Sequence, residues 1–349
     1  MDRDDLIQAV AEGEVVAGGD LAGTDFSGAD LSGAMLEKVR LTSCNLRETS
    51  LRESVLTRCD LSGADLSAAN LHLATLVECT LPNAVLTSAN LAATKWTQCD
   101  LAGANLDGAE LVIAVLHEPD LSGAKLSRAN LDRTSILDAT CGQVDLSGAT
   151  LRQTILMKAD LRRARLDGAQ LHNAVLLESD LRGQSLAGMD LALCQLMGAK
   201  LSDCDLSGCV LERCNFKDAD LLGANLAQAQ ANNALFIGAR LAGARLTGAR
   251  LEQALFVEAE LSQTDLADAN LQMAIFHRAQ ATDSRFNDAD LTYADFSHAD
   301  ISGSDFSGAT LFRTKLHQVT ETGTIFTDRS KALGDDELLA EAERWDAGH

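Results

Sequence analysis

The sequence predicts an all-β solenoid, in which the chain winds in turns that stack on one another. Three observations predict it: a large apolar residue recurs at every fifth position, a small residue stands two places before it, and a second pattern recurs every twenty residues. A step of five matches neither an α-helix, with 3.6 residues per turn, nor a strand, with a period of two. It matches a chain that turns a corner at every fifth residue.

The five-residue step runs from Leu21 to Phe326 without a shift in register. It visits 62 positions, of which 58 hold Leu, Ile, Phe or Trp. The exceptions are Cys141, Ala231, Ala281 and Glu321. The residue two places earlier is small, as Ala64 is before Leu66. We expect the large and the small residue of each step to point inward together, and the other three to face water.

These units have the form A(D/N)LXX, as in residues 64–68, and they resemble the repeats of the pentapeptide-repeat family over about nine-tenths of the chain. The resemblance implies a right-handed quadrilateral β-helix with four repeats, or 20 residues, in each coil. It also implies about 15 coils here. Each coil of such a solenoid contacts only its neighbours, so stability adds up along the stack.

A twenty-residue period in the sequence is separate evidence for four faces in each turn, and it shows that one face differs from the other three. The residue just before each large residue is normally polar, but at one step in four it is repeatedly apolar. The residue just after the large residue is often apolar at the same step. The aliphatic face defined in this way comprises Met35, Val55, Val77, Val115, Leu137, Ile155, Met157, Val175, Leu177, Met197, Leu235, Ile237, Leu255, Val257 and Ile275. Soluble monomers rarely leave so large an apolar patch uncovered. We interpret this face as a partner-binding surface; the alternative is that it is a by-product of the fold.

The two ends of the solenoid need caps, because an open end exposes unpaired backbone groups. The predicted parts are an N-terminal capping helix at 1–18, the solenoid at 19–327 and a C-terminal helical cap at 328–349. Helices are expected at Asp2–Glu14, where acids occupy the first turn, and at Asp335–Trp345. In the second helix, the residues expected to pack on the last coil are Leu338, Leu339 and Trp345.

Several inward positions hold residues other than Leu and Ala. Nine Cys are present, and those with regular spacing are Cys59, Cys79, Cys99, Cys204, Cys209 and Cys214. They occupy the small inward position, where Cys packs as a small apolar residue, so we interpret them as reduced core thiols. An inward aromatic ladder is expected from Phe216, Phe236, Phe256, Phe276 and Phe296, which stand 20 apart.

Three histidines fall near one face in three successive coils: His277, His298 and His317. Metal binding or pH sensing is conceivable for such a group. An exposed His on a solenoid face commonly has no special role, so we expect no metal site and no cofactor.

Composition and shape exclude several functional classes. A net charge of -22 disfavours direct binding of nucleic acid. No apolar run approaches the roughly 20 residues that span a bilayer, and the acidic N-terminus does not resemble a signal peptide, so we expect a cytoplasmic protein without membrane insertion. A straight solenoid offers no concave, partly dry pocket to tune a catalytic acid or base, so no enzymatic activity is expected.

Two functions remain open. The first is a scaffold or adaptor that holds another protein, or a second copy of itself, along the aliphatic face. Segments at 277–278, 284–286, 293–298, 312–313 and 336–345 resemble pentapeptide-repeat proteins of type VI secretion gene clusters, which implies an accessory to a spike or an effector. The alternative is DNA mimicry, because some family members resemble B-form DNA and bind DNA gyrase, giving fluoroquinolone protection. The charge fits a mimic, whereas the length, the lack of a loop insertion and the aliphatic face do not.

Overall fold

The chain forms a β-solenoid of about 16 turns with two short helices, one turn more than expected. A computed structural model describes residues 1–346. Each turn takes 20 residues, because almost every backbone bridge joins a residue to the one 20 positions further on. The chain divides into two compact units, Met1–Asp180 and Leu181–His349, which are described separately.

The first unit begins with helix α1 (Arg3–Ala11). The Asp2 side chain accepts hydrogen bonds from the backbone N–H groups of Asp4 and Asp5, and the Asp5 carboxylate accepts one from the Asp2 N–H. This reciprocal pair is a capping box, and it explains why the helix starts here. Leu6, on the inner side of the helix, is fully buried. The helix ends three residues before its predicted end.

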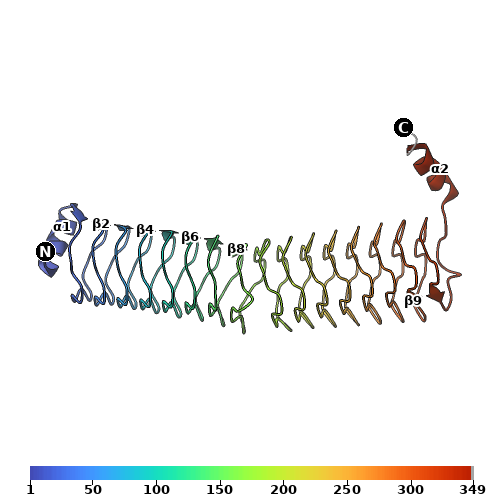
Figure 1. Cartoon of the computed structure of the whole chain (residues 1–349), viewed down its shortest axis with the longest axis horizontal. Helices are drawn as coiled ribbons and strands as arrows, with labels where there is room; N and C mark the ends of the chain where they lie inside the picture. The colour runs from blue at the N-terminus through green and yellow to red at the C-terminus, as the bar shows by residue number, and fades with distance from the viewer. Residues whose placement is uncertain (347–349) are drawn as a thin grey trace. The chain divides into compact units, whose positions relative to one another are not determined.

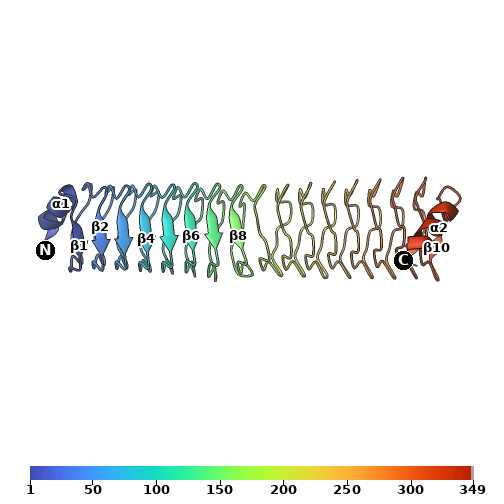
Figure 2. The same ribbon diagram turned by 90° about the horizontal axis from the view of Figure 1, so that it is seen from above.

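Eight strands of the first unit form one parallel sheet in the order β1 to β8. They are β1 (Val15–Ala17), β2 (Met35–Glu37), β3 (Val55–Thr57), β4 (Thr75–Val77), β5 (Lys95–Thr97), β6 (Val115–His117), β7 (Ser135–Leu137) and β8 (Ile155–Met157). Figures 1 and 2 show them side by side along one side of the blue to green turns. The middle residue of each strand is buried and the two flanking residues point outward. The outward positions are those of the predicted aliphatic face.

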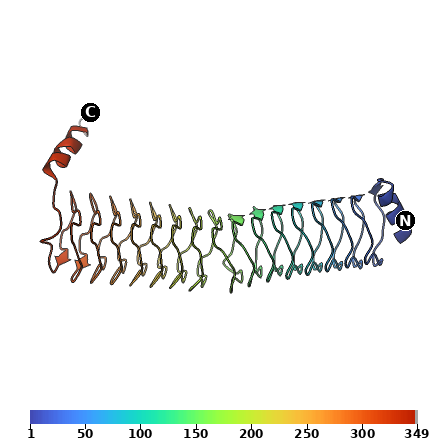
Figure 3. The ribbon, with the colours of Figure 1, turned by 180° about the vertical axis from the view of Figure 1, so that it is seen from behind.

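The second unit repeats the same turns, held mostly by single bridges between residues 20 apart. Strands β9 (Asp305–Phe306) and β10 (Ile325–Phe326) pair in parallel near its end. Helix α2 (Glu337–Asp346) follows, and Figure 3 shows it projecting outward from the end of this unit, joined to it by a short segment. Among the described residues, no helix is both long enough and apolar enough to cross a bilayer.

Each turn has four sides. Four bridges, at positions 35, 40, 45 and 50, join one turn to the next at intervals of five residues. The second residue after almost every large inward residue has a left-handed backbone, whether it is Gly23 (φ 71°) or Lys38 (φ 54°). This conformation redirects the chain at the corner, and Gly adopts it without steric cost.

The interior is built from the two inward positions of each repeat, as predicted; Leu66 and Ala64, for example, are completely buried. The predicted ladder is present, with ring centroids 4.4–4.9 Å apart along Phe216, Phe236, Phe256, Phe276 and Phe296. A second ladder stacks beside it, formed by Phe286, Phe306 and Phe326. The two ladders meet edge to face, a favourable arrangement of aromatic rings.

All nine cysteines are free and buried, which confirms their assignment to the core. Three successive thiols donate hydrogen bonds of 2.8–2.9 Å to backbone carbonyls 23 residues earlier; they belong to Cys204, Cys209 and Cys214. Burial raises the pKa of the Cys141 thiol to about 12 and that of Cys209 to about 11. These thiols therefore remain protonated at neutral pH.

Phe256→Ala should destabilise the second unit by about 3–5 kcal/mol, because it opens a cavity between two stacked rings. Phe256→Leu should cost less, since Leu fills the equivalent inward position on the other sides of the turn. Hydrogen exchange of residues 236–276 under partly denaturing conditions measures both effects locally. A loss below about 1 kcal/mol in the Ala variant would contradict the ladder's role.

The native chain should react slowly with a thiol-specific chromogenic reagent at pH 8, because the thiolate is the reactive species and burial suppresses it. All nine thiols should react at once in guanidinium chloride. Rapid reaction of several thiols in the native protein would contradict their core position.

Candidate functional site

Nine residues of the predicted aliphatic face lie in the first unit, at outward positions of β2 to β8 and of the turn after β8. Met35, Val55 and Val115 are exposed, and the other six are half-buried. The column is interrupted, because Lys95 stands between the Val55 and Val115 levels. The first unit therefore has an aliphatic patch at residues 15–77, which includes the exposed Val15, and another at residues 115–177.

Six residues of the face lie in the second unit: Met197, Leu235, Ile237, Leu255, Val257 and Ile275. Leu235, Leu255 and Ile275 bridge one another directly, so their side chains form one column. They line a shallow groove of about 420 Å³ together with Asn233, Gln253 and Met273. Asn215 and Lys217 separate Met197 from this column.

The same face ends, in the second unit, beneath the chain's own helix α2. The register of Ile237 and Val257 continues to His277 and, two turns later, to His317. These histidines line a cavity of about 310 Å³, whose other wall comes from the segment before α2 and from α2 itself, including Leu339 and Glu343. Figure 2 shows α2 over the last turns. One helix is therefore already docked on this face.

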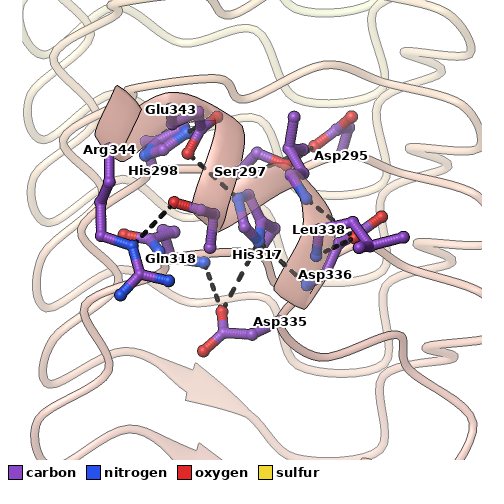
Figure 4. Close-up of polar contacts among 12 residues, drawn as sticks. Asp295, Ser297, His298, His317, Gln318, Asp335, Asp336, Leu338, Glu343 and Arg344 are labelled. Atoms are coloured by element: carbon purple, nitrogen blue, oxygen red, sulfur yellow. Dashed lines mark hydrogen bonds and ion pairs between the residues drawn. The ribbon is translucent and has the colours of Figure 1, made fainter. Parts of the chain in front are cut away.

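A carboxylate of α2 bridges two of the histidines (Figure 4). The Nε2 atom of His298 lies 3.0 Å from Oε1 of Glu343, and Nε2 of His317 lies 3.3 Å from Oε2. The backbone N–H of Asp336 donates to Nδ1 of His317 over 3.1 Å. Because Nδ1 accepts this bond, the ring proton of neutral His317 lies on Nε2 and is donated to Glu343.

The electrostatics of the cluster favour an ionised Glu343 and a neutral His277. Burial acts to raise the pKa of Glu343, but hydrogen bonds from His298 and His317 outweigh it and leave that pKa below its usual value. Burial, together with the neighbouring Arg278 and His298, lowers the pKa of His277. The rings of His277 and His298 meet edge to face at 5.3 Å.

The expectation that the three histidines are ordinary exposed residues is wrong: His277 and His298 are half-buried and His317 is buried. His317 is only 3% exposed, and the His298 side chain is 26% exposed. The physical reason is α2, which covers the turns that carry them. Their common face was visible in the sequence, but the cover comes from a segment outside the repeat.

The expected packing of α2 is also corrected. Leu338 and Trp345 are 80% and 73% exposed, whereas Ala340 is buried. The helix faces the solenoid with the stripe that runs from Leu339 and Ala340 to Glu343, and positions 338 and 345 fall on another side. The signal that sequence reasoning missed is this stripe, which places one carboxylate opposite the histidines.

The chain matches two models of one repeat family. The model of pentapeptide repeats (8 copies) matches residues 16–47, 114–153, 139–176, 174–213, 279–318 and 289–328. The model of the pentapeptide repeat region matches residues 51–126 and 209–282. No curated protein sequence matches the chain.

Solved structures with a similar repeat include HetL, a pentapeptide repeat protein involved in heterocyst differentiation regulation from the cyanobacterium Nostoc sp. strain PCC 7120. It is 24% identical, with 90% of this chain and 96% of HetL covered and a TM-score of 0.22. A trypsin-treated variant of QnrB1, a plasmid-mediated fluoroquinolone resistance protein, is 19% identical over 57% of this chain and 96% of its own, with a TM-score of 0.32. Rfr23 from the cyanobacterium Cyanothece 51142 is 23% identical over 48% of this chain and 92% of its own, with a TM-score of 0.19.

Membership is decided by the repeat models and by the twenty-residue register of the structure, not by these superpositions. The first model alone covers more than half of the residues, and the two together cover nearly all of the solenoid. The chain belongs to the pentapeptide-repeat family.

Proposed function

We propose that this protein is a non-enzymatic scaffold that binds a partner protein along its aliphatic face. The observation that carries the proposal is the docking of α2 on the C-terminal end of this face in the second unit. The turns before these repeat the same backbone register, so they would present a second helix with the same backbone spacing and with aliphatic side chains in place of the histidines.

The expected partner is an amphipathic helix with aliphatic side chains on one side. The column of Leu235, Leu255 and Ile275 offers it an apolar floor. Asn233 and Gln253 stand at the edge of the groove, where they would hydrogen-bond the polar flank of such a helix. An apolar centre with a polar rim is the usual anatomy of a protein–protein interface.

The first partner to test is a spike or effector of a type VI secretion system. The motifs that resemble members from such gene clusters lie in the second unit and include α2 itself. Co-expression with the spike encoded in the same cluster and purification through the spike measures this directly. Failure to co-purify would remove this partner and leave the face without an assigned one.

A second candidate is DNA gyrase, favoured by the net charge of -22. A gyrase supercoiling assay distinguishes it from the scaffold. Inhibition, or protection from a fluoroquinolone, at micromolar protein would support mimicry of DNA. We expect neither, because the aliphatic face stands where a mimic needs charge.

The scaffold is tested with a variant that carries Leu235→Ser, Ile237→Ser, Leu255→Ser and Val257→Ser. Partner affinity should fall at least about 30-fold, because the loss of a single hot-spot side chain, about 2 kcal/mol, is enough to produce it. Circular dichroism should stay unchanged, because these side chains point outward.

A matched control places the same number of changes on other faces of neighbouring turns: Asn225→Ser, Arg245→Ser, Arg250→Ser and Asn270→Ser. It should bind normally. Equal binding by both variants would contradict the proposal. Sedimentation velocity of the two variants identifies the case in which the partner is a second copy, because self-association would then be lost in the first variant alone.

A further inference from the structure

The His298, His317 and Glu343 cluster has the donor set of a transition-metal site. It offers two imidazole nitrogens and a carboxylate oxygen, which all lie within 4.8 Å of one another. Two neighbouring turns of the solenoid supply the histidines and α2 supplies the acid. Imidazole favours zinc, copper, nickel and iron over magnesium and calcium, and a His₂Glu set occurs in zinc sites that keep an open position.

The three donor groups lie close enough together to reach a common ion after small side-chain shifts. Zinc bonds of about 2.0–2.1 Å in tetrahedral geometry place donor atoms roughly 3.3 Å apart. Nε2 of His298 is 3.0 Å from Oε1 of Glu343, Nε2 of His317 is 3.3 Å from Oε2, and one donor atom from each residue lies within 4.8 Å of the others. Both Nε2 atoms face the Glu343 carboxylate, and the two rings stand edge to face with centroids 5.4 Å apart.

The surroundings also suit a metal. His317 is almost fully buried, and the cavity beside the cluster leaves room for a water as a further ligand. When Nε2 of His317 binds an ion, its single ring proton must move to Nδ1. Asp335 Oδ1 lies 3.7 Å from Nδ1 and would have to move closer to accept that proton. A carboxylate behind a ligating imidazole is the usual arrangement in zinc sites. The bond from the Asp336 N–H is given up in exchange.

We propose that His298, His317 and Glu343 bind one divalent transition-metal ion, for which zinc is the probe, and that the ion fastens α2 to the solenoid. The site is independent of the proposed partner and would exist whether or not the aliphatic face binds a protein. It would hold the C-terminal end of that face permanently covered while the turns before it stay open.

The test uses the full chain without a polyhistidine tag, stripped with EDTA and titrated with ZnCl₂ at pH 7.5 by calorimetry. One zinc should bind per chain. His298→Gln, His317→Gln and Glu343→Gln should each weaken binding more than about 10-fold, since even residues behind a ligand cost that much. The matched control is His117→Gln, because His117 occupies the same position of its turn beside Glu118 but has no second imidazole; it should bind as the parent does.

A second measurement reports on α2 rather than on affinity. Trypsin cuts after Arg344, which lies in α2 next to Glu343. Zinc should slow this cleavage in the parent chain and not in His298→Gln, which changes only the solenoid side of the cluster. The visible absorption of bound Co²⁺ separates nitrogen and oxygen ligands from thiolates of the nine cysteines.

Two outcomes would overturn the proposal. The first is that the intact chain binds no zinc at concentrations up to about 100 µM, which is well above the dissociation constant of a structural zinc site. The second is that zinc binding or tryptic protection survives unchanged in all three ligand variants. In either case the cluster only holds α2 on the solenoid through its hydrogen bonds and binds no metal ion.

Discussion

The structure depends on the backbone hydrogen bond between one turn and the next. Asp65 donates its N–H to the carbonyl of Cys44 in the turn before, and Leu66 donates to Val85 in the turn after. Because the same step of 20 residues is repeated along the stack, a residue keeps its place in the turn, and its neighbours above and below have that place too. Side chains therefore stack in columns, and each column has its own environment.

The columns explain why most of the fold could be predicted from the sequence. Inward columns hold Leu, Ala, Cys or Phe, so a period of five in the sequence predicts the corners of the turn. The aromatic ladder that starts at Phe216 is predicted by the 20-residue spacing of its members. The second ladder has the same spacing at Phe286 and Phe306, so it too is predictable from the sequence. The outward column of Leu235 and Leu255 was also visible, because the period of 20 separates one face from the others.

What could not be predicted lies where the columns end. Helix α2 has apolar residues on two sides, and the sequence does not say which side faces the solenoid. The larger side chains, Leu338 and Trp345, suggested one answer, but the contacts of Glu343 with His298 and His317 select the other. The burial of His317 follows from that choice, so it could not be read from the repeat alone.

Columns whose residues are not needed for packing or for contact with water are the best indication of function. The inward positions are fixed by packing, and most outward positions carry the polar residues that any water-facing turn would carry. The outward aliphatic column and the histidine cluster beneath α2 are needed neither for packing the core nor for contact with water. Both lie on one face of the second unit, the face on which α2 docks.

The central claim is that this face, rather than any other, meets the partner. A photo-activatable amino acid at position 255, on the aliphatic column, tests it in the native cell against the same label at position 245, on another face of the preceding turn. The account predicts one discrete cross-linked protein, or a cross-linked dimer, from position 255 and none from position 245. Equal cross-linking from both positions, or cross-linking from position 245 alone, would contradict it.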